Sequence, residues 1–323
     1  MQFIKFLTKT KPNSNKLGNK ASNLIKLIKA GIRVPNGFVV NTKSYNKFLN
    51  KTKLKKKIQS FFSNGYDTHD VLNISTKIKT LILEAEFPKK VRSRVEKAYN
   101  KIISKNGINP KFAVRSSSTF EDLKDFSFAG QAESYLNRIS LEDILLSIKN
   151  CWASLFSPQA LLYLLQLRKK DYKISPLDLE IAIIIQHMIE AQVSGVLFTA
   201  NVINKDRNQI LINSTWGLGN TITSGIVTPD SYILSKKEFE ILKHEIGEKS
   251  KISVPDDNAS STVLIETNPE LKKESSLTDT QLKQLFDLAN IVEKLFNYPQ
   301  DIEWAFDKGI LYTLQSRPIT TIK

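Results

Sequence analysis

The chain has 323 residues, 41% of them hydrophobic and 24% charged, a composition typical of a soluble globular protein with room for two lobes. Its single cysteine, Cys151, excludes an intramolecular disulfide and a cysteine-rich zinc site and favours a reducing cytoplasm. No apolar run approaches the ~18 residues of a membrane span. The net charge of +15 comes mainly from dispersed lysines without interleaved aromatics, so we expect neither a membrane nor nucleic acid as a partner.

The first pattern with chemical content runs from Gly18 to Lys20. A polar stretch precedes it, and apolar residues at helical spacing follow it as far as Gly31, a typical helix end. A loop that leads into a helix with a lysine in its first turn is able to hold a phosphate group. Ordinary helix starts show the same pattern, so alone it leaves both interpretations open. Residues 34–40 then predict a turn entering a buried strand, and residues 50–107 predict polar helices.

A second pattern begins with a short apolar strand that delivers Arg115 into a run of hydroxyl residues, Ser116 to Thr119. Arginine forks onto phosphate oxygens, and hydroxyls such as those of Ser117 and Thr119 add donors. An ordinary serine-rich loop is the alternative. Small residues beside aromatics over 126–131 favour a loop that folds over a ligand and excludes water.

The middle of the chain predicts one long helix and then a series of strands. The helical pattern over 141–169 places Trp152 in the core. Residues 179–186 predict a buried strand that runs into a polar segment ending at Glu190, which favours an adenine-binding hinge. Further strands are expected up to residue 234. Residues 245–277 are polar and predict a variable excursion, after which an amphipathic helix is expected over 278–296.

The last pattern is a β-hairpin over 301–318, with an Asp-x-Gly turn at 307–309. Alternation predicts an apolar face of Ile302, Trp304 and Phe306 opposite Ile310, Tyr312 and Leu314. The other face is predicted to collect Asp301, Glu303, Gln315 and Arg317. Acids, an amide and a guanidinium suit a metal ion and a phosphate, whereas the alternative is a solvated face on an edge hairpin.

Eight motifs of the chain, in order, resemble those of the N-terminal nucleotide-binding domain of the phosphoenolpyruvate synthase and pyruvate phosphate dikinase family, which rifampicin phosphotransferases and glucan dikinases share. The resemblance spans nearly the whole chain. Its motifs are Gly18-Asn19-Lys20, Val34 to Phe38, Val114 to Asp122, Phe128 to Gln131, Ser194 to Thr199, Trp216 to Gly219, Thr228-Pro229-Asp230, and Asp301 to Trp304 with Gln315 to Pro318. Asn19 stands where the family usually has a second glycine, and asparagine tolerates the positive φ of such a loop.

The resemblance implies an α+β, ATP-grasp fold, with lobes over 1–186 and 187–323 and ATP in the cleft between them. It implies three cations on the phosphates, and a magnesium ion held by Glu303 and Gln315. A loop around Gly130 and Gln131 would cover the phosphates, and the segment from Gln186 through Met188 to Glu190 would meet adenine and ribose. The three cations are Lys20, Arg115 and Arg317, and Ser117 and Thr119 complete the expected cofactor-binding set.

In the family, ATP passes its β-phosphate to a histidine on a separate domain, with release of AMP and phosphate. His69, His187 and His244 all lie outside the glycine- and threonine-rich context of that histidine. We therefore expect the acceptor on a partner protein or a downstream domain. Two alternatives stay open: a stand-alone phosphotransferase acting on a small molecule, and a nucleotide-binding module without turnover. The sequence does not identify the final phosphate acceptor.

Overall fold

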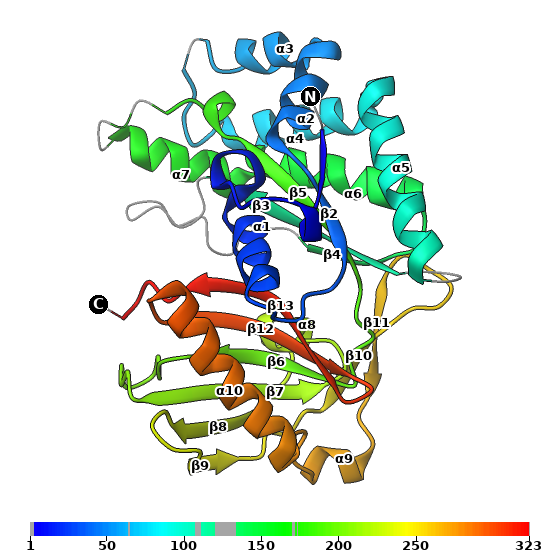
Figure 1. Cartoon of the computed structure of the whole chain (residues 1–323). Helices are drawn as coiled ribbons and strands as arrows, with labels where there is room; N and C mark the ends of the chain where they lie inside the picture. Colours follow the sequence, from blue (N-terminus) through cyan, green and yellow to red (C-terminus); the bar gives the residue numbers. More distant parts are fainter. Residues whose placement is uncertain are drawn as a thin grey trace. The chain divides into compact units, whose positions relative to one another are not determined.

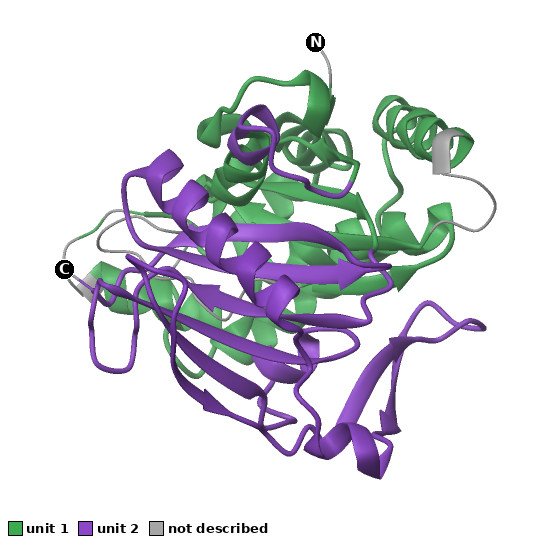
Figure 2. Ribbon diagram, turned by 60° about the horizontal axis from the view of Figure 1, so that its bottom comes forward, with its two compact units in different colours: residues 1–25, 36–188 green, residues 26–35, 189–323 purple. Residues whose placement is uncertain are grey.

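The computed structural model describes residues 3–63, 65–106, 111–119, 134–169, 172 and 174–322. The chain divides into two compact units (Figure 2), one formed by residues 1–25 and 36–188 and the other by residues 26–35 and 189–323. Each unit combines a sheet with helices, which confirms the expected α+β class. Among the described residues, no helix has the length and apolar character needed to cross a membrane.

Unit 1 is built on a five-stranded antiparallel sheet with the order β1-β2-β5-β3-β4 (Figure 1). Its central strand, β5, carries a run of isoleucines whose branched side chains suit a buried strand. The strand predicted over 179–186 is therefore confirmed, although it begins two residues later and ends one residue later than expected. The bounds are β1 Ile4–Phe6, β2 Gly37–Val40, β3 Phe112–Ser118, β4 Ser134–Arg138 and β5 Ile181–His187.

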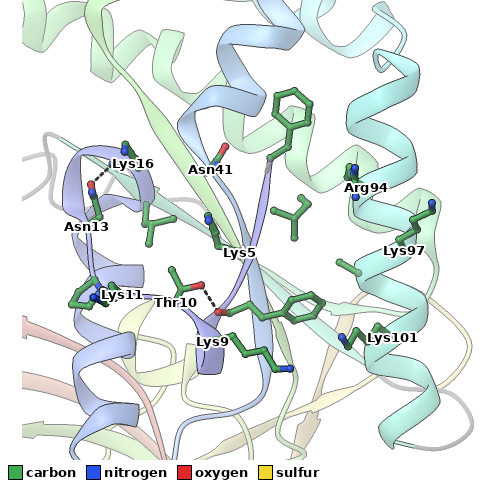
Figure 3. Close-up of a pocket in the computed structure, with 16 residues that line it drawn as sticks. Lys5, Lys9, Thr10, Lys11, Asn13, Lys16, Asn41, Arg94, Lys97 and Lys101 are labelled. Carbon is green, nitrogen blue, oxygen red and sulfur yellow. Dashed lines mark hydrogen bonds between the residues drawn. The ribbon is translucent and has the colours of Figure 1, made fainter. Parts of the chain in front are cut away.

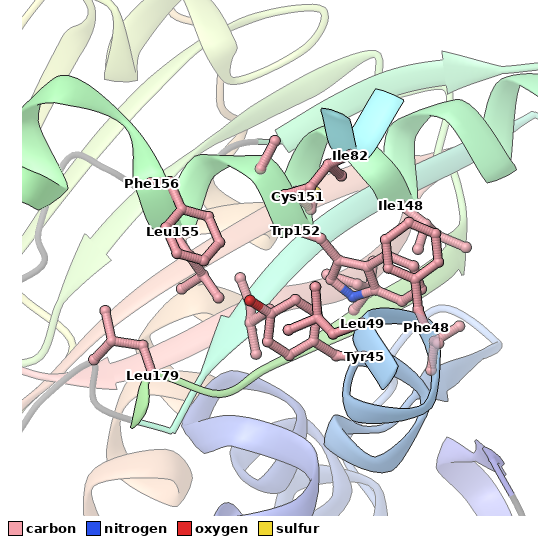
Figure 4. Packing of buried hydrophobic residues seen from close by; sticks show 14 of the residues in the cluster. Tyr45, Phe48, Leu49, Ile82, Ile148, Cys151, Trp152, Leu155, Phe156 and Leu179 are labelled. Atoms are coloured by element: carbon pink, nitrogen blue, oxygen red, sulfur yellow. The ribbon is translucent and has the colours of Figure 1, made fainter. Parts of the chain in front are cut away.

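Helices cover this sheet and bury an aromatic cluster around Trp152, which is 0% exposed and confirms the expected core position. The Trp152 ring lies 4.8 Å from that of Phe48 and 5.9 Å from that of Tyr45, measured between centroids (Figure 4). The helices are α1 Ser14–Lys29, α2 Thr42–Lys51, α3 Leu54–Ser60, α4 Val71–Glu84, α5 Lys89–Asn106, α6 Leu141–Ala153 and α7 Pro158–Lys169, with short 3-10 turns η1 Leu7–Lys9, η2 Ser154–Phe156 and η3 Pro176–Asp178.

Unit 2 is built on a six-stranded antiparallel sheet with the order β13-β12-β6-β7-β8-β9. Helix α10 (Asp279–Phe296) lies across this sheet (Figure 1), starts at a Thr278–Gln281 capping box and ends at Asn297 in the left-handed conformation. The strands are β6 Val193–Phe198, β7 Gln209–Trp216, β8 Asp230–Ser235, β9 Ile241–Glu245, β12 Gln300–Asp307 and β13 Ile310–Pro318, and two short helices are α8 Asn220–Thr223 and α9 Pro269–Lys273.

Residues 245–277, expected to be a variable excursion, contain a two-stranded sheet separate from the six-stranded one. Strands β10 (Lys251–Pro255) and β11 (Thr262–Glu266) pair there, and Lys249 is 0% exposed. Its ammonium pairs with the equally buried Asp230. The second Asp230 oxygen accepts from the Ser276 hydroxyl at 2.6 Å. A buried charge is stable only when it is paired in this way. Asp230 of the Thr228-Pro229-Asp230 motif therefore anchors residues 245–277 to unit 2.

Candidate functional site

Helix α1 is interrupted at Gly18, whose φ of 74° and ψ of 168° are not helical. A turn of helix precedes the break, where the sequence predicted a loop, and the remaining helix starts with Asn19 and Lys20 as expected. A Cβ on Gly18 would lie 2.1 Å from the Ser117 carbonyl oxygen and 2.3 Å from Ser117 Oγ. Only glycine combines this backbone conformation with so close an approach.

Ser117 on β3 fastens the chain on both sides of the Gly18 break. Its hydroxyl donates to the carbonyl oxygen of Leu17 at 2.8 Å and accepts the amide N–H of Ala21 at 3.1 Å. Ser117 is 0% exposed. The sequence predicted Ser117 as a cofactor-binding residue. It did not predict that Ser117 bonds to both Leu17 and Ala21, an arrangement that we call the Ser117 clasp. Nothing local could have revealed it, because about a hundred residues separate the two partners.

Lys20 lies between Leu17 and Ala21, the two residues that Ser117 holds. Its side chain is only 7% exposed, and lysine is seldom buried to this extent. The backbone around it is fixed by Gly18 on one side and by the Ala21–Ser117 hydrogen bond on the other. Because the backbone is already fixed, only the side chain of Lys20 loses conformational freedom when it binds an anion.

The register of β3 and β5 brings Arg115, Ser117 and Gln186 to one face of the unit 1 sheet. Arg115 pairs with Ile184, Ser117 with Ala182, and Gln186 with Ala113. Side chains alternate along a strand, so these three share a face, while the even-numbered β3 residues turn to the aromatic core. The Gly18 segment packs on the same face through Ser117. Arg115 and the Lys20 segment thus lie on the same side of the unit 1 sheet.

The other predicted residues near unit 1 lie in different surroundings. Thr119 bonds to the Glu180 carbonyl through both its N–H and its hydroxyl, at 3.2 and 3.1 Å. Met188 is 4% exposed, and its sulfur accepts the Asn137 N–H at 3.0 Å. Glu190 is exposed and belongs to unit 2. The border between the units falls after Met188, inside the predicted adenine-binding segment. Gly130 and Gln131 lie outside the described residues.

In unit 2 the predicted hairpin is present. Its two-residue turn is formed by Lys308 and Gly309, with φ values of 49° and 76°, as in a type I′ turn. Asp301 pairs with Arg317 and Glu303 with Gln315, so the predicted polar face is confirmed.

The apolar face is correct on β12 and wrong on β13. The pairing register shifts between Glu303 and Trp304, so that Trp304 faces the buried Thr313. An extra residue in one strand moves every later side chain to the opposite face. Tyr312 therefore pairs with Ala305, away from the Trp304 face.

Trp304 is accommodated in the sheet by a glycine on the neighbouring strand. A Cβ on Gly195 of β6 would lie 2.6 Å from Trp304 Cζ2 and 2.0 Å from the Asn213 carbonyl oxygen. This close approach explains why the Ser194-Gly195-Val196 motif has glycine at its centre.

The polar face of the hairpin consists of two cross-strand contacts. Gln315 Nε2 donates to Glu303 Oε1 at 3.2 Å, and Arg317 Nε donates to Asp301 Oδ2 at 2.8 Å. Burial raises the pKa of the Asp301 carboxyl above its usual value, while Arg317 lowers it and Glu303 raises it further. Asp301 thus pairs with Arg317 across the hairpin, and Glu303 pairs with Gln315.

Glu303 and Gln315, the predicted magnesium ligands, carry carboxylate and amide oxygens, which are ligand types that magnesium accepts. Magnesium takes oxygen ligands and usually keeps water and substrate phosphate oxygens in addition to one or two protein ligands. Within the described part of the chain, no three His, Cys, Asp or Glu side chains cluster as a complete metal site. Two protein oxygen ligands match the number that magnesium usually takes from a protein.

Comparisons with known proteins cover nearly all of the chain. The family described as "Pyruvate phosphate dikinase, AMP/ATP-binding domain" matches residues 14–323. A probable phosphoenolpyruvate synthase of Methanocaldococcus jannaschii is 38% identical over 100% of this chain and 27% of its own length. The phosphoenolpyruvate synthase of Pyrococcus furiosus is 33% identical over 100% of the chain and 44% of its own. Rifampicin phosphotransferase of Bacillus subtilis is 35% identical over 95% of this chain and 34% of its own length. The chain thus spans less than half of each relative.

Proposed function

Because this chain belongs to the family of the pyruvate phosphate dikinase AMP/ATP-binding domain, we propose that it binds magnesium ATP and phosphorylates a histidine. The histidine nitrogen attacks the β-phosphorus and AMP leaves, while water takes up the γ-phosphoryl group as inorganic phosphate. The acceptor belongs to a partner protein or a further domain. The names of the relatives and the coverage of the whole chain support this proposal.

The proposed fold is an ATP-grasp, in which residues of both units serve one nucleotide. Lys20 and Arg115 of unit 1 and Arg317 of unit 2 neutralise the phosphates. Magnesium, when bound by Glu303 and Gln315, supplies further neutralisation of phosphate charge. Gln186, Met188 and Glu190 meet adenine and ribose, with Ser117 and Thr119 near the phosphates and the loop of Gly130 and Gln131 covering them.

One observation carries most of this proposal: contacts within unit 1 hold the backbone of the Lys20 segment in place. Gly18 and the Ser117 clasp fix its backbone, and Arg115 extends from the same sheet face. Phosphoryl transfer asks a protein mainly for positioning and for charge neutralisation. Preorganised cations meet both demands, because no reorganisation is needed as the transition state forms.

The paired contacts on the β12–β13 hairpin support the same reaction. Asp301 accepts a hydrogen bond from Arg317 Nε, and the planar guanidinium of Arg317 suits phosphate oxygens. Glu303 and Gln315 touch each other, so both are within reach of a single ion. The Asp301–Arg317 pair would then serve the phosphates, and the Glu303–Gln315 pair would serve the metal.

The reaction is tested by product analysis with ATP labelled at the β-phosphate. The chain is incubated with magnesium, the label and histidine-bearing proteins from its own genome, and the products are separated. AMP together with label on a partner histidine is the expected result. ADP that keeps the label, together with a phosphorylated small molecule, would instead establish the stand-alone phosphotransferase. ATP binding without any product would establish a binding module.

A further inference from the structure

A basic cavity of about 760 Å³ lies at the β1 edge of unit 1. Strand β1, the segment through η1 to Leu17, and helix α5 form its walls (Figure 3). Strands β2 and β5 separate β1 from β3, which carries Arg115. None of the residues assigned above to ATP or magnesium lines this cavity.

The walls of the cavity carry one sign of charge. Of its 16 described lining residues, seven are basic and none is acidic, although the whole chain has 32 acidic residues beside 47 basic ones. The seven cations come from all three walls. They are Lys5, Lys9, Lys11, Lys16, Arg94, Lys97 and Lys101.

The cavity has a fixed frame. The Thr10 hydroxyl donates to the Phe6 carbonyl at 2.7 Å, and the Lys16 N–H bonds to the Asn13 side chain at 3.1 Å. On α5, the positions of Arg94, Lys97 and Lys101 share one helix face because they are three and four residues apart. Its buried lining residues include Ile4, Leu17, Asn41 and Ala98.

We propose that this cavity binds a small oligophosphate, either an inorganic polyphosphate or a nucleoside polyphosphate. Like charges held around one space repel each other, and a multiply charged anion removes that repulsion. Lysine and arginine are the usual phosphate-binding side chains. The volume lies within the range of small-molecule pockets, which favours a small ligand over a nucleic acid strand.

The test is calorimetric titration of the full chain with inorganic tripolyphosphate, in the presence of saturating magnesium and a non-hydrolysable ATP analogue. The analogue occupies the nucleotide site, so tripolyphosphate that binds without releasing it, or that releases a second equivalent of it, belongs to a second site. Replacing two exposed α5 cations (Arg94→Gln with Lys97→Gln) is expected to weaken that binding about tenfold or more. Glutamine keeps helix propensity, and thermal unfolding confirms that the variant is folded.

A matched control removes the same charge elsewhere: Lys55→Gln with Lys56→Gln, both exposed on α3. This control should change the affinity by less than about twofold. A parallel titration with GTP tells whether a nucleoside adds to the phosphate contacts, since GTP would then bind more tightly than tripolyphosphate. Equal losses in both variants, no second site, or binding confined to a single-stranded oligonucleotide would each overturn the proposal.

Discussion

Gly18 and Ser117 approach so closely that a Cβ on Gly18 would lie 2.1 Å from the Ser117 carbonyl oxygen. This contact fixes the backbone immediately before Lys20. Its partners are backbone and buried side-chain atoms, so the surroundings have little freedom to relax.

Gly18→Ala is therefore expected to weaken ATP binding at least about tenfold and to lower the free energy of unfolding by about 2–4 kcal/mol. Gly31→Ala is a matched control, because Gly31 has a similar φ of 79° but nothing within 4 Å of its Cβ position. The control carries the backbone strain without the collision. Chemical denaturation and ATP titration compare the two variants. Equal effects in both would show that the collision with Ser117 is unimportant.

Ser117→Ala should leave the Leu17 carbonyl and the Ala21 N–H without their shared partner. Removing hydrogen bonds from buried groups costs about 1–3 kcal/mol of stability, and the loosened Lys20 segment should bind ATP more weakly. Denaturation and ATP affinity are measured together. Ser60→Ala serves as the control, because its exposed hydroxyl bonds only within α3. If Ser117→Ala left the ATP affinity unchanged, the hydrogen bonds of Ser117 would have no role in positioning Lys20.

Glu303→Gln should reduce AMP formation at least about a hundredfold and shift the magnesium titration to higher concentrations, because it removes the charged ligand of the ion. The fold should persist, since glutamine is close in size. Asp307→Asn at the other end of β12 is the control and should leave the magnesium dependence unchanged. A normal magnesium titration in the Glu303 variant would refute its assigned role.

The raised pKa of Asp301 gives a pH dependence with a definite sign. In the folded state the carboxyl keeps its proton above its ordinary pKa of 3.8. Its contribution to stability is therefore fully present below that value and is lost as pH rises through the folded pKa. The stability of the parent chain relative to Asp301→Asn should fall from about pH 4 upward. Urea unfolding of both proteins across this range measures the difference, and a difference that rises with pH would show that the Arg317 pair outweighs burial.

Local patterns predicted the parts of the structure that local physics decides. The Asp-x-Gly signal found the hairpin turn at Lys308 and Gly309, because few other sequences adopt positive φ twice in succession. Alternation placed Glu303 and Gln315 on one face, and helical periodicity placed Trp152 in the core.

Long-range relationships had no such signal. The Ser117 clasp and the Lys249–Asp230 pair join residues far apart in sequence. The register shift beside Trp304 depends on the strand opposite, and nothing in residues 26–35 marks them as part of the second unit. The site residues themselves could be proposed only because several motifs occurred together in the order of one family.

The central claim is that the residue sets of the two units serve a single magnesium ATP. Calorimetric titration with a non-hydrolysable ATP analogue tests it directly, in the parent chain and in the Lys20→Ala and Arg317→Ala variants. The account predicts that both variants lose affinity at one and the same nucleotide site, about tenfold or more in each. Two nucleotide sites of which each variant weakens a different one, or an affinity that only one variant changes, would contradict it.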